Sequence, residues 1–507
     1  MASNNFQDTI SPAYTFSGAS LDLGRAMLDG KVMPDLKIQV PLKTMNRHGL
    51  ISGATGTGKT KTLQLMAEGL SDASVPVLLM DIKGDLSGIA AAGTANDALN
   101  SRVQQLGITY KPCAYPVEPL SLSSEPGARL RATVSEFGPV LLAKILGLND
   151  TQEGILAMLF KYCDDNKIPL LDLKDMQRLM QWAANEGKDE LAATYGGLSP
   201  ASIGTIMRNV VGLQQQGADS FFGEPSFQVN DLMRLSSDGR GMVSIVRVTD
   251  LQDRPLLFST FMLQLLSELY NSLPEAGDVD QPKLVMFIDE AHLIFSDASD
   301  VLIKQLETII KLIRSKGVGI FFCTQNPMDI SSSVLSQLGM KVQHALRAFT
   351  AADRKTIVQT AANYPDSTFY KTDELITQLG IGEALVTLLD EQGIPTPLVQ
   401  SMMLPPHSRM DILSPQEIQS LVSASPLVSK YSQTLDSDSA FEILNRKIAD
   451  AGTVATAANS GGNGGTGQAA APSFWDSMMN NSTVKSMMRT AGNTLVRNIM
   501  GSLLKKL

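Results

Sequence analysis

The sequence predicts an α/β fold whose core is a mainly parallel sheet of the P-loop type. Three observations support this prediction. A phosphate-binding motif stands between a short apolar segment, 48–52, and a segment of helical period, 61–70. Two further apolar segments, 75–81 and 283–289, end in a carboxylate, as buried parallel strands do at the sheet edge where ligands bind. Between these two segments, residues 111–235 have helical spacing, which indicates a helical insertion.

The phosphate-binding motif reads Gly-Ala-Thr-Gly-Thr-Gly-Lys-Thr and begins at Gly53. Its glycines permit backbone conformations closed to other residues, so that successive N–H groups can point at one anion. Lys59 can reach the β- and γ-phosphates of a nucleotide, and the Thr60 hydroxyl can ligate Mg²⁺. The helix that follows turns its positive end to the same phosphates. The residues predicted to bind the nucleotide are Gly53, Ala54, Thr55, Gly56, Thr57, Gly58, Lys59, Thr60 and Lys61.

The composition is that of a globular protein. The chain has 507 residues, of which 43% are hydrophobic and 18% charged, and this length suits roughly two to four domains. The formal net charge of −9 does not suggest a nucleic-acid-binding protein, although binding depends on local patches. Three widely spaced cysteines suit a reducing cytosol, and residues 1–14 lack the basic and apolar regions of a signal peptide. No run of about 18 apolar residues occurs, so we expect a cytoplasmic protein without a transmembrane helix.

A segment of 45 residues, 1–45, is expected to precede the core. Residues 1–17 are expected to form a loose leader, and short strands follow it. The first part of the core, 46–110, contains the phosphate-binding motif and the strand that ends at Asp81. Asp81, Lys83 and Asp85 lie at the carboxyl end of this strand, where they could contact Mg²⁺ or position water. The alternative is an ordinary polar turn.

The second part of the core, 236–405, contains a second chemical motif, an apolar strand that ends in Asp289 and Glu290. Asp289 would hold Mg²⁺, and Glu290 would polarise the water that attacks the γ-phosphate, as a general base does. The alternative for this acidic pair is a helix N-cap. Gln325, at the polar end of the apolar strand 318–325, could sense the γ-phosphate. The last strand is expected at 383–389, before prolines close the core.

The charge along the chain bears on what the protein binds. The helical insertion, 111–235, has 11 basic residues against 15 acidic ones, which argues against a main nucleic-acid surface there. Residues 300–360 have eight basic residues against four acidic ones, and could face a polyanion or form a solvated helix face.

The C-terminal part is expected to lie outside the core. Residues 406–450 have helical spacing, and 451–472 are rich in Gly, Ala, Asn and Ser, as a flexible linker is. The tail, 473–507, is predicted to be an amphipathic helix with five basic residues and one acidic residue. This helix could mediate oligomerisation, bind a protein partner or contact a membrane surface. The alternative is that it packs on its own core.

Four motifs together resemble HerA/FtsK-type motor ATPases over roughly residues 20–450. They are Arg47–Gly53, which runs into the phosphate loop, Ile288–His292, Arg314–Gly319 and Thr324–Pro327. The resemblance is greatest to the bacterial HerA-like family typified by YjgR. It implies a RecA-like (ASCE-type) core with an extra strand between the phosphate-loop strand and the Asp-Glu strand. It also implies a hexameric ring with ATP at the subunit interfaces and double-stranded DNA as the usual substrate.

The resemblance also implies roles for individual residues. Lys59, Thr60, Asp289, Glu290 and Gln325 match the catalytic positions of the family. The family places an arginine finger, which reaches the ATP of the neighbouring subunit, just before the strand that ends in the glutamine. The residue that fits is Arg314, and its rivals are Arg347 and Arg354.

The leading hypothesis is therefore an ATP-hydrolysing motor, acting as a ring, that translocates or remodels a polymer. The alternative is an ATP-dependent regulatory switch or assembly protein whose tail, 473–507, binds a protein partner without DNA translocation. A third hypothesis is a pump ATPase like those of secretion systems, which the expected absence of a transmembrane anchor weakens.

Overall fold

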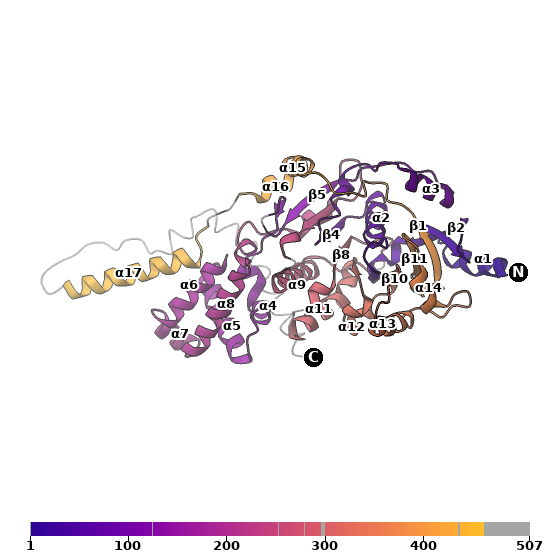
Figure 1. Ribbon diagram of the computed structural model, residues 1–507. Coiled ribbons are helices and arrows are strands. Elements are labelled where there is room, and N and C mark those ends of the chain that lie inside the picture. The colour runs from indigo at the N-terminus through magenta and orange to yellow at the C-terminus, as the bar shows by residue number, and fades with distance from the viewer. Residues whose placement is uncertain are drawn as a thin grey trace. The chain divides into compact units, whose positions relative to one another are not determined.

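The computed structural model describes residues 2–460, except 124, 252, 278, 296–299, 434 and 436. The chain falls into two compact units, Met1–Leu444 and Asn445–Leu507. In the described part of the first unit, twelve strands form one sheet, and helices pack against it (Figure 1). The second unit is described only as the end of helix α17 (Ala440–Ser460).

The strands follow the order β2-β1-β12-β11-β10-β3-β9-β8-β4-β7-β5-β6 across the sheet. From β10 to β6 neighbouring strands are parallel, whereas β2, β1, β12 and β11 pair in antiparallel fashion. Strand β9 lies between the phosphate-loop strand β3 and the Asp-Glu strand β8, which confirms the predicted RecA-like core. The strands are β1 Ser20–Leu28, β2 Lys31–Pro41, β3 Gly49–Ser52, β4 Val77–Asp81, β5 Val117–Ser121, β6 Ala128–Arg129, β7 Val243–Arg247, β8 Leu284–Ile288, β9 Val318–Thr324, β10 Met340–Gln343, β11 Glu383–Thr387 and β12 Val399–Met403.

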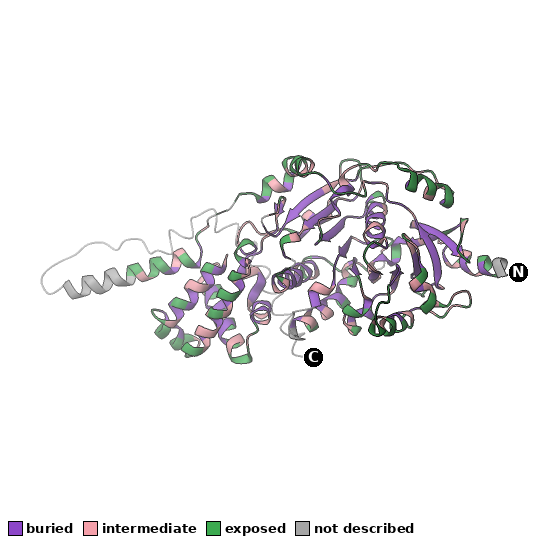
Figure 2. Ribbon diagram, viewed as in Figure 1, coloured by how far each residue is buried: buried purple, intermediate pink, exposed green. Residues whose placement is uncertain are grey.

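The central strands are buried on both faces, as Figure 2 shows by colour. Phe321 of β9 joins the hydrophobic cluster that contains Leu63 of α2. Its neighbour Phe322 has the opposite side-chain direction and contacts Phe295 of α10, with ring centroids 6.1 Å apart. Helices therefore cover both faces, which explains why these strands are continuous apolar runs without alternation.

The helices fall into those that cover the sheet and those of the insertion. Between β6 and β7 the described chain forms helices α4 to α8. Side-chain caps begin four of them, with Thr133, Asn149, Asp172 and Ser199 each accepting a backbone hydrogen bond from the following turn. The described helices are α1 Ala2–Ala13, α2 Lys59–Asp72, α3 Asp97–Leu106, α4 Val134–Ile145, α5 Asp150–Asn166, α6 Leu173–Ala184, α7 Lys188–Thr194, α8 Pro200–Gln215, α9 Pro255–Ser272, α10 His292–Phe295, α11 Asp300–Ile313, α12 Ser332–Leu335, α13 Ala351–Ala361, α14 Thr372–Gln378, α15 Pro415–Ala424, α16 Pro426–Tyr431 and α17 Ala440–Ser460.

Two strands stand where the sequence led us to expect only helices. Strands β5 and β6 lie within 111–235 but belong to the main sheet, so the helical part begins only at Val134. Pro119 in β5 hid this strand from the sequence analysis, since proline reads as a strand breaker. The residue is tolerated because β5 pairs on its outer side only through Leu120 and Ser121.

The expectation of a loose leader was wrong. Helix α1 covers Ala2–Ala13, and the side chains of Phe6, Ile10 and Tyr14 are fully buried at a spacing of four residues. The Tyr14 hydroxyl lies 2.7 Å from the Pro397 carbonyl oxygen and accepts a hydrogen bond from Thr396. The helix has few apolar residues in a polar segment, so its hydrophobic periodicity is too weak to predict a helix from the sequence.

The C-terminal half holds two further differences. Strand β12 (Val399–Met403) lies among the prolines that were expected to close the core, and it pairs with β1 and β11. Its sequence lacks an apolar run, since Gln400 and Ser401 are buried in it. Helix α17 continues to Ser460, into the segment expected as linker, 451–472. The rest of that linker and the predicted tail helix, 473–507, lie outside the described residues. In the part that is described, no helix combines the length and apolar character that crossing a membrane requires.

We expect Phe6→Ala to lower the free energy of unfolding by about 3–5 kcal/mol, because truncating a fully buried phenylalanine leaves a cavity. Urea denaturation of the full chain measures this loss. Phe349→Ala is the matched control, since that side chain is 87% exposed and should change stability by less than about 0.5 kcal/mol. Equal effects of the two changes would contradict the docking of α1.

Candidate active site

The phosphate loop connects β3 to α2 at the carboxyl edge of the parallel strands. Gly53, Gly56 and Gly58 have φ angles of +151°, +77° and +116°, which other residues rarely adopt. A Cβ atom at Gly53 would come within 2.5 Å of the Cβ of His344. The motif therefore needs glycine both for its backbone angles and for the space beside it.

Neighbouring strands hold this loop in place. The Ala54 N–H donates to the Ala345 carbonyl at 2.8 Å, and the Gly382 N–H donates to the Thr57 carbonyl at 2.9 Å. The Thr57 hydroxyl closes the loop by donating to the Ala54 carbonyl at 2.7 Å. The backbone cradle is thus set by the sheet before any anion binds.

Lys59 lies at the first position of α2 and is buried. Its Nζ atom is 3.4 Å from the Ala54 carbonyl oxygen, so the ammonium group lies against the loop. Burial lowers the pKa of Lys59, and the nearby positive charge of Lys83 lowers it further. An anionic phosphate next to Lys59 would stabilise the protonated, positively charged form of its amino group. Thr60, next along the helix, is half-buried.

Asp289 follows β8 and is 2% exposed. Burial raises its pKa to about 6, with the Glu290 carboxylate as the next cause. Within the described residues its Oδ2 atom is buried and has no hydrogen-bond partner. An orphaned carboxylate oxygen beside the phosphate loop fits a divalent cation, for which Thr60 would be the second oxygen ligand predicted from the sequence.

Glu290 occupies a strained position. Its φ angle is +45°, in the left-handed region, and its side chain is 5% exposed. The ammonium of Lys83 forms an ion pair with Oε1, and His292 Nδ1 lies 3.2 Å from Oε2. Burial alone would raise the pKa of Glu290, but the hydrogen bond and charge of Lys83 hold it below its usual value. A positive φ angle in a non-glycine residue costs about 1–3 kcal/mol of conformational free energy, and such residues occur often at functional sites.

Gln325 connects Glu290 to the phosphate loop. Its Nε2 atom donates to Glu290 Oε1 at 3.3 Å, while its Oε1 atom accepts from the Thr55 hydroxyl at 3.2 Å. One amide therefore contacts both the loop that would hold the phosphates and the carboxylate that would orient water. Of the predicted catalytic residues, the structure brings Lys59, Glu290 and Gln325 together.

The three polar residues at the carboxyl end of β4, of which Asp81 is the last strand residue, have different surroundings. The Asp85 carboxylate has a buried Oδ1 atom without a hydrogen-bond partner among the described residues. The Asp81 carboxylate accepts hydrogen bonds from the N–H groups of Gly84, Asp85 and Leu86 at 2.8–3.3 Å, as in an ordinary polar turn. Lys83, in contrast, reaches Glu290. Lys83 was expected among residues that could contact Mg²⁺ or position water, but its contact with Glu290 was not predicted. The observation that could have predicted this contact is the position of Lys83, two residues beyond the end of β4, which runs parallel to β8.

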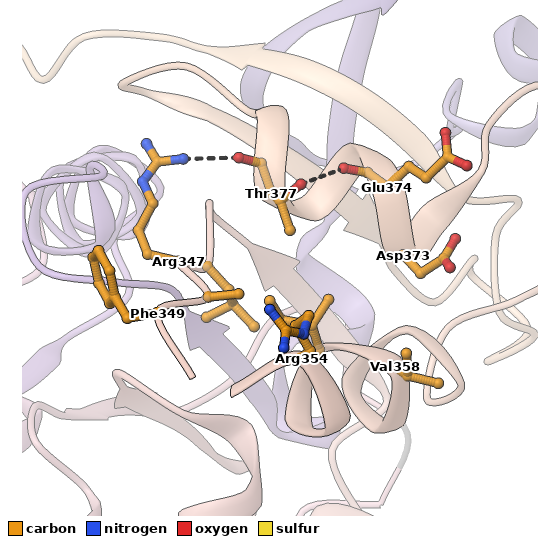
Figure 3. Close-up of a pocket in the computed structure, with 10 residues that line it drawn as sticks. Arg347, Phe349, Arg354, Val358, Asp373, Glu374 and Thr377 are labelled. Atoms are coloured by element: carbon orange, nitrogen blue, oxygen red, sulfur yellow. Dashed lines mark hydrogen bonds between the residues drawn. The ribbon is translucent and has the colours of Figure 1, made fainter. Parts of the chain in front are cut away.

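The candidate arginine fingers lie at opposite edges of the sheet. Arg314 opens the 3₁₀ turn η6 (Arg314–Lys316), which precedes β9, so it lies at the amino edge, away from the phosphate loop. Arg347 lies beyond the carboxyl end of β10, and its Nη1 atom donates to the Thr377 carbonyl at 2.8 Å. Arg347 and Arg354 line a cavity of about 520 Å³ between α13 and α14 (Figure 3).

The helicase HerA-like C-terminal family matches residues 27–507. The chain belongs to this family. It is 22% identical over 385 residues to the DNA double-strand break repair helicase HerA of Sulfurisphaera tokodaii, covering 73% of this chain and 67% of that protein. A probable helicase of Methanocaldococcus jannaschii is 22% identical over 410 residues, which are 74% of this chain and 69% of that one.

Among solved structures, the bacterial conjugative coupling protein TrwBΔN70 has a TM-score of 0.50 and 13% identity, covering 80% of this chain and 93% of its own. At this identity the match concerns the fold alone. Together with family membership, it identifies the HerA-like chain as a P-loop ATPase with a RecA-like core.

Two buried histidines make the stability of this HerA-like protein depend on pH. His344 lies beneath the phosphate loop, where its ring contacts the Thr62 hydroxyl and the Glu383 carbonyl, both at 2.9 Å. His48 accepts a hydrogen bond from the Ile320 N–H at 3.0 Å. Burial lowers the pKa of each to about 4 from 6.5. Both rings are therefore neutral in the fold at pH values where an unfolded histidine gains a proton.

We predict that each histidine costs about 3 kcal/mol of stability at pH 4 compared with pH 7. Above pH 6.5 the neutral histidines cause no loss of stability. As the pH falls from 6.5 to about 4, the free energy of unfolding decreases, because the unfolded chain binds protons that the folded chain does not. The measurement is the difference in unfolding free energy between wild type and His344→Gln at several pH values, in which other groups cancel. This difference should shrink toward low pH, and a constant difference would contradict the buried neutral state.

Proposed function

We propose that the chain is an ATP-driven motor that acts on double-stranded DNA and works as a ring, a hexamer by family resemblance. The observation that carries the ATPase part is the chain of contacts from Thr55 through Gln325 to Glu290. The DNA part is supported by the relatives of this family, three of which are DNA double-strand break repair helicases by name. Of the predicted boundaries, those at residues 235, 405 and 472 remain proposals. Those at 45, 110 and 450 are not proposed again, because β1, β2, β5 and β6 belong to the main sheet and α17 runs through residue 450.

The residues suit the hydrolysis of ATP in a definite way. The loop N–H groups and Lys59 would bind the β- and γ-phosphates. Thr60 and Asp289 would hold Mg²⁺, which when bound neutralises charge that develops on the transferred phosphoryl group. Glu290 would accept the proton of the attacking water, since its pKa lies low enough to keep the carboxylate ionised. Gln325 would register the γ-phosphate through its contact with the loop.

The position of Arg314 favours an assembly in which subunits complete one another's sites. It lies at the amino edge of the sheet, and the phosphate loop lies at the carboxyl edge. A finger at Arg314 can therefore serve only the nucleotide of a neighbouring subunit. Arg347 lies at the same edge as the loop of its own chain, which makes it the weaker candidate for a finger in trans.

We predict that Glu290→Gln lowers the ATP hydrolysis rate by about 10²–10⁴-fold and still binds ATP, because only the base is lost. Lys59→Ala should lose productive binding of ATP. Steady-state hydrolysis and equilibrium binding of a labelled ATP measure the two effects, and the melting temperature of each variant verifies its fold. Full turnover by Glu290→Gln would make the assignment of the base wrong.

Linear double-stranded DNA should raise the hydrolysis rate of the full chain, and rising salt should remove this effect, since phosphate contacts release counterions. The mass of the assembly with ATP bound is measured on the same sample. A rate that no nucleic acid changes would contradict the DNA proposal. It would favour the switch hypothesis, in which the tail, 473–507, binds a protein partner.

Mixing variants tests the trans arrangement. We predict that Arg314→Ala loses about 10³–10⁵-fold in rate, as removal of an arginine finger does. Subunits with Arg314→Ala mixed with subunits carrying Lys59→Ala should regain activity, because some interfaces then combine an intact loop with an intact finger. Arg347→Ala serves as the comparison. Full activity of Arg314→Ala together with loss in Arg347→Ala would move the finger to Arg347.

A further inference from the structure

Lys83 lies beside the proposed general base because of the sheet topology. Strands β4 and β8 are parallel neighbours, with Met80 paired to Ile288. Residues just beyond the two strand ends therefore emerge side by side. Lys83 and Glu290 emerge there, and the Lys83 ammonium forms an ion pair with Glu290 Oε1.

The turn that carries Lys83 is fixed by its surroundings. The Asp81 carboxylate accepts hydrogen bonds from the backbone N–H groups of Gly84, Asp85 and Leu86, which directly follow Lys83. Leu86 is 1% exposed. Gly84 has a φ angle of +76°, and a Cβ atom there would lie 3.1 Å from the Thr249 methyl group. The backbone from which the Lys83 side chain projects is thus held in one conformation.

Glu290 needs such a neighbour. Its carboxylate is 5% exposed and lies one residue from the buried carboxylate of Asp289. Gln325 donates a hydrogen bond to the Glu290 Oε1 atom at 3.3 Å, near the long limit for hydrogen bonds. The Glu290 Oε2 atom is buried and has no hydrogen-bond partner among the described residues, although His292 Nδ1 lies 3.2 Å away. Lys83 is the strong contact, and its own side chain is 36% exposed, so its charge stays partly hydrated. The ammonium therefore offsets the repulsion between two buried carboxylates and fixes the direction of one of them.

We propose that Lys83 is a positioning residue for ATP hydrolysis, whose ammonium holds the Glu290 carboxylate in the orientation that activates water. The proposal rests on the proposed role of Glu290 as general base. In this role Lys83 differs from the residues that bind the phosphates. Lys83 acts on the group that activates water, so its loss should affect turnover rather than ATP binding.

The test compares Lys83→Met, Lys83→Arg and Lys144→Met in the full chain. Lys144 is the matched control, since its side chain is 24% exposed and pairs with Glu153 at 3.1 Å within the helical insertion. We expect Lys83→Met to lower kcat by about 10–100-fold and to change KM and the ATP dissociation constant by less than about threefold. Lys83→Arg should recover part of kcat, because it restores the charge, and Lys144→Met should match wild type.

A double-variant comparison distinguishes positioning from general damage. If Lys83 acts through Glu290, then Lys83→Met should cause no further loss in single-turnover hydrolysis when Glu290→Gln is already present. Independent, multiplying losses would overturn the proposal, as would unchanged kcat in Lys83→Met or a loss confined to ATP binding. Should Lys83→Met prove unstable on melting, Lys83→Gln replaces it in the same comparison. If Glu290 is not the general base, the result is different: Glu290→Gln alone then keeps its turnover.

Discussion

The burial of two adjacent carboxylates, Asp289 and Glu290, at the end of β8 is the constraint on which the site depends. Two negative charges in a poorly solvated place repel each other and lose hydration. The pKa of Asp289 rises to about 6 for this reason. The remaining parts of the site compensate: Lys83 on the neighbouring strand end, Lys59 across the phosphate loop, and an oxygen of Asp289 left open for a cation. The negative charge that is costly to bury here is the charge that a bound cation would neutralise.

The same fold holds the phosphate loop from the side opposite to these carboxylates. His344 and Ala345, which follow β10, lie under the loop, and Gly382 bonds to its far end. The segment that carries Gly382 is itself fixed by Arg102 of α3, whose Nη1 atom donates to the carbonyls of Gly382 and Met403 at 3.1 and 3.2 Å. The loop is therefore organised by strands distant in sequence, which no local pattern around Gly53 records.

This contrast explains how much the sequence could predict. The loop, the Asp-Glu pair and Gln325 were predictable, because each stands where an apolar run meets polar residues, and the parallel topology then brings those ends together. Helix α1, strand β5 and strand β12 were not, since their burial depends on distant partners and their sequences contain polar residues or proline. Lys83 belongs between these cases: its place was visible, but its partner Glu290 follows only from the pairing of β4 with β8.

Strand β9 gives the fold a mechanical property that the individual residues lack. Its seven residues, Val318–Thr324, are all buried, so it is held rigidly between β3 and β8. Arg314 lies just before its amino end, and Gln325 follows its carboxyl end. With Arg314 as the proposed finger, one strand of about 20 Å joins the group that enters the neighbour's site to the group that contacts Glu290. In the proposed assembly, a shift at one nucleotide site would have a direct covalent path to the next through β9.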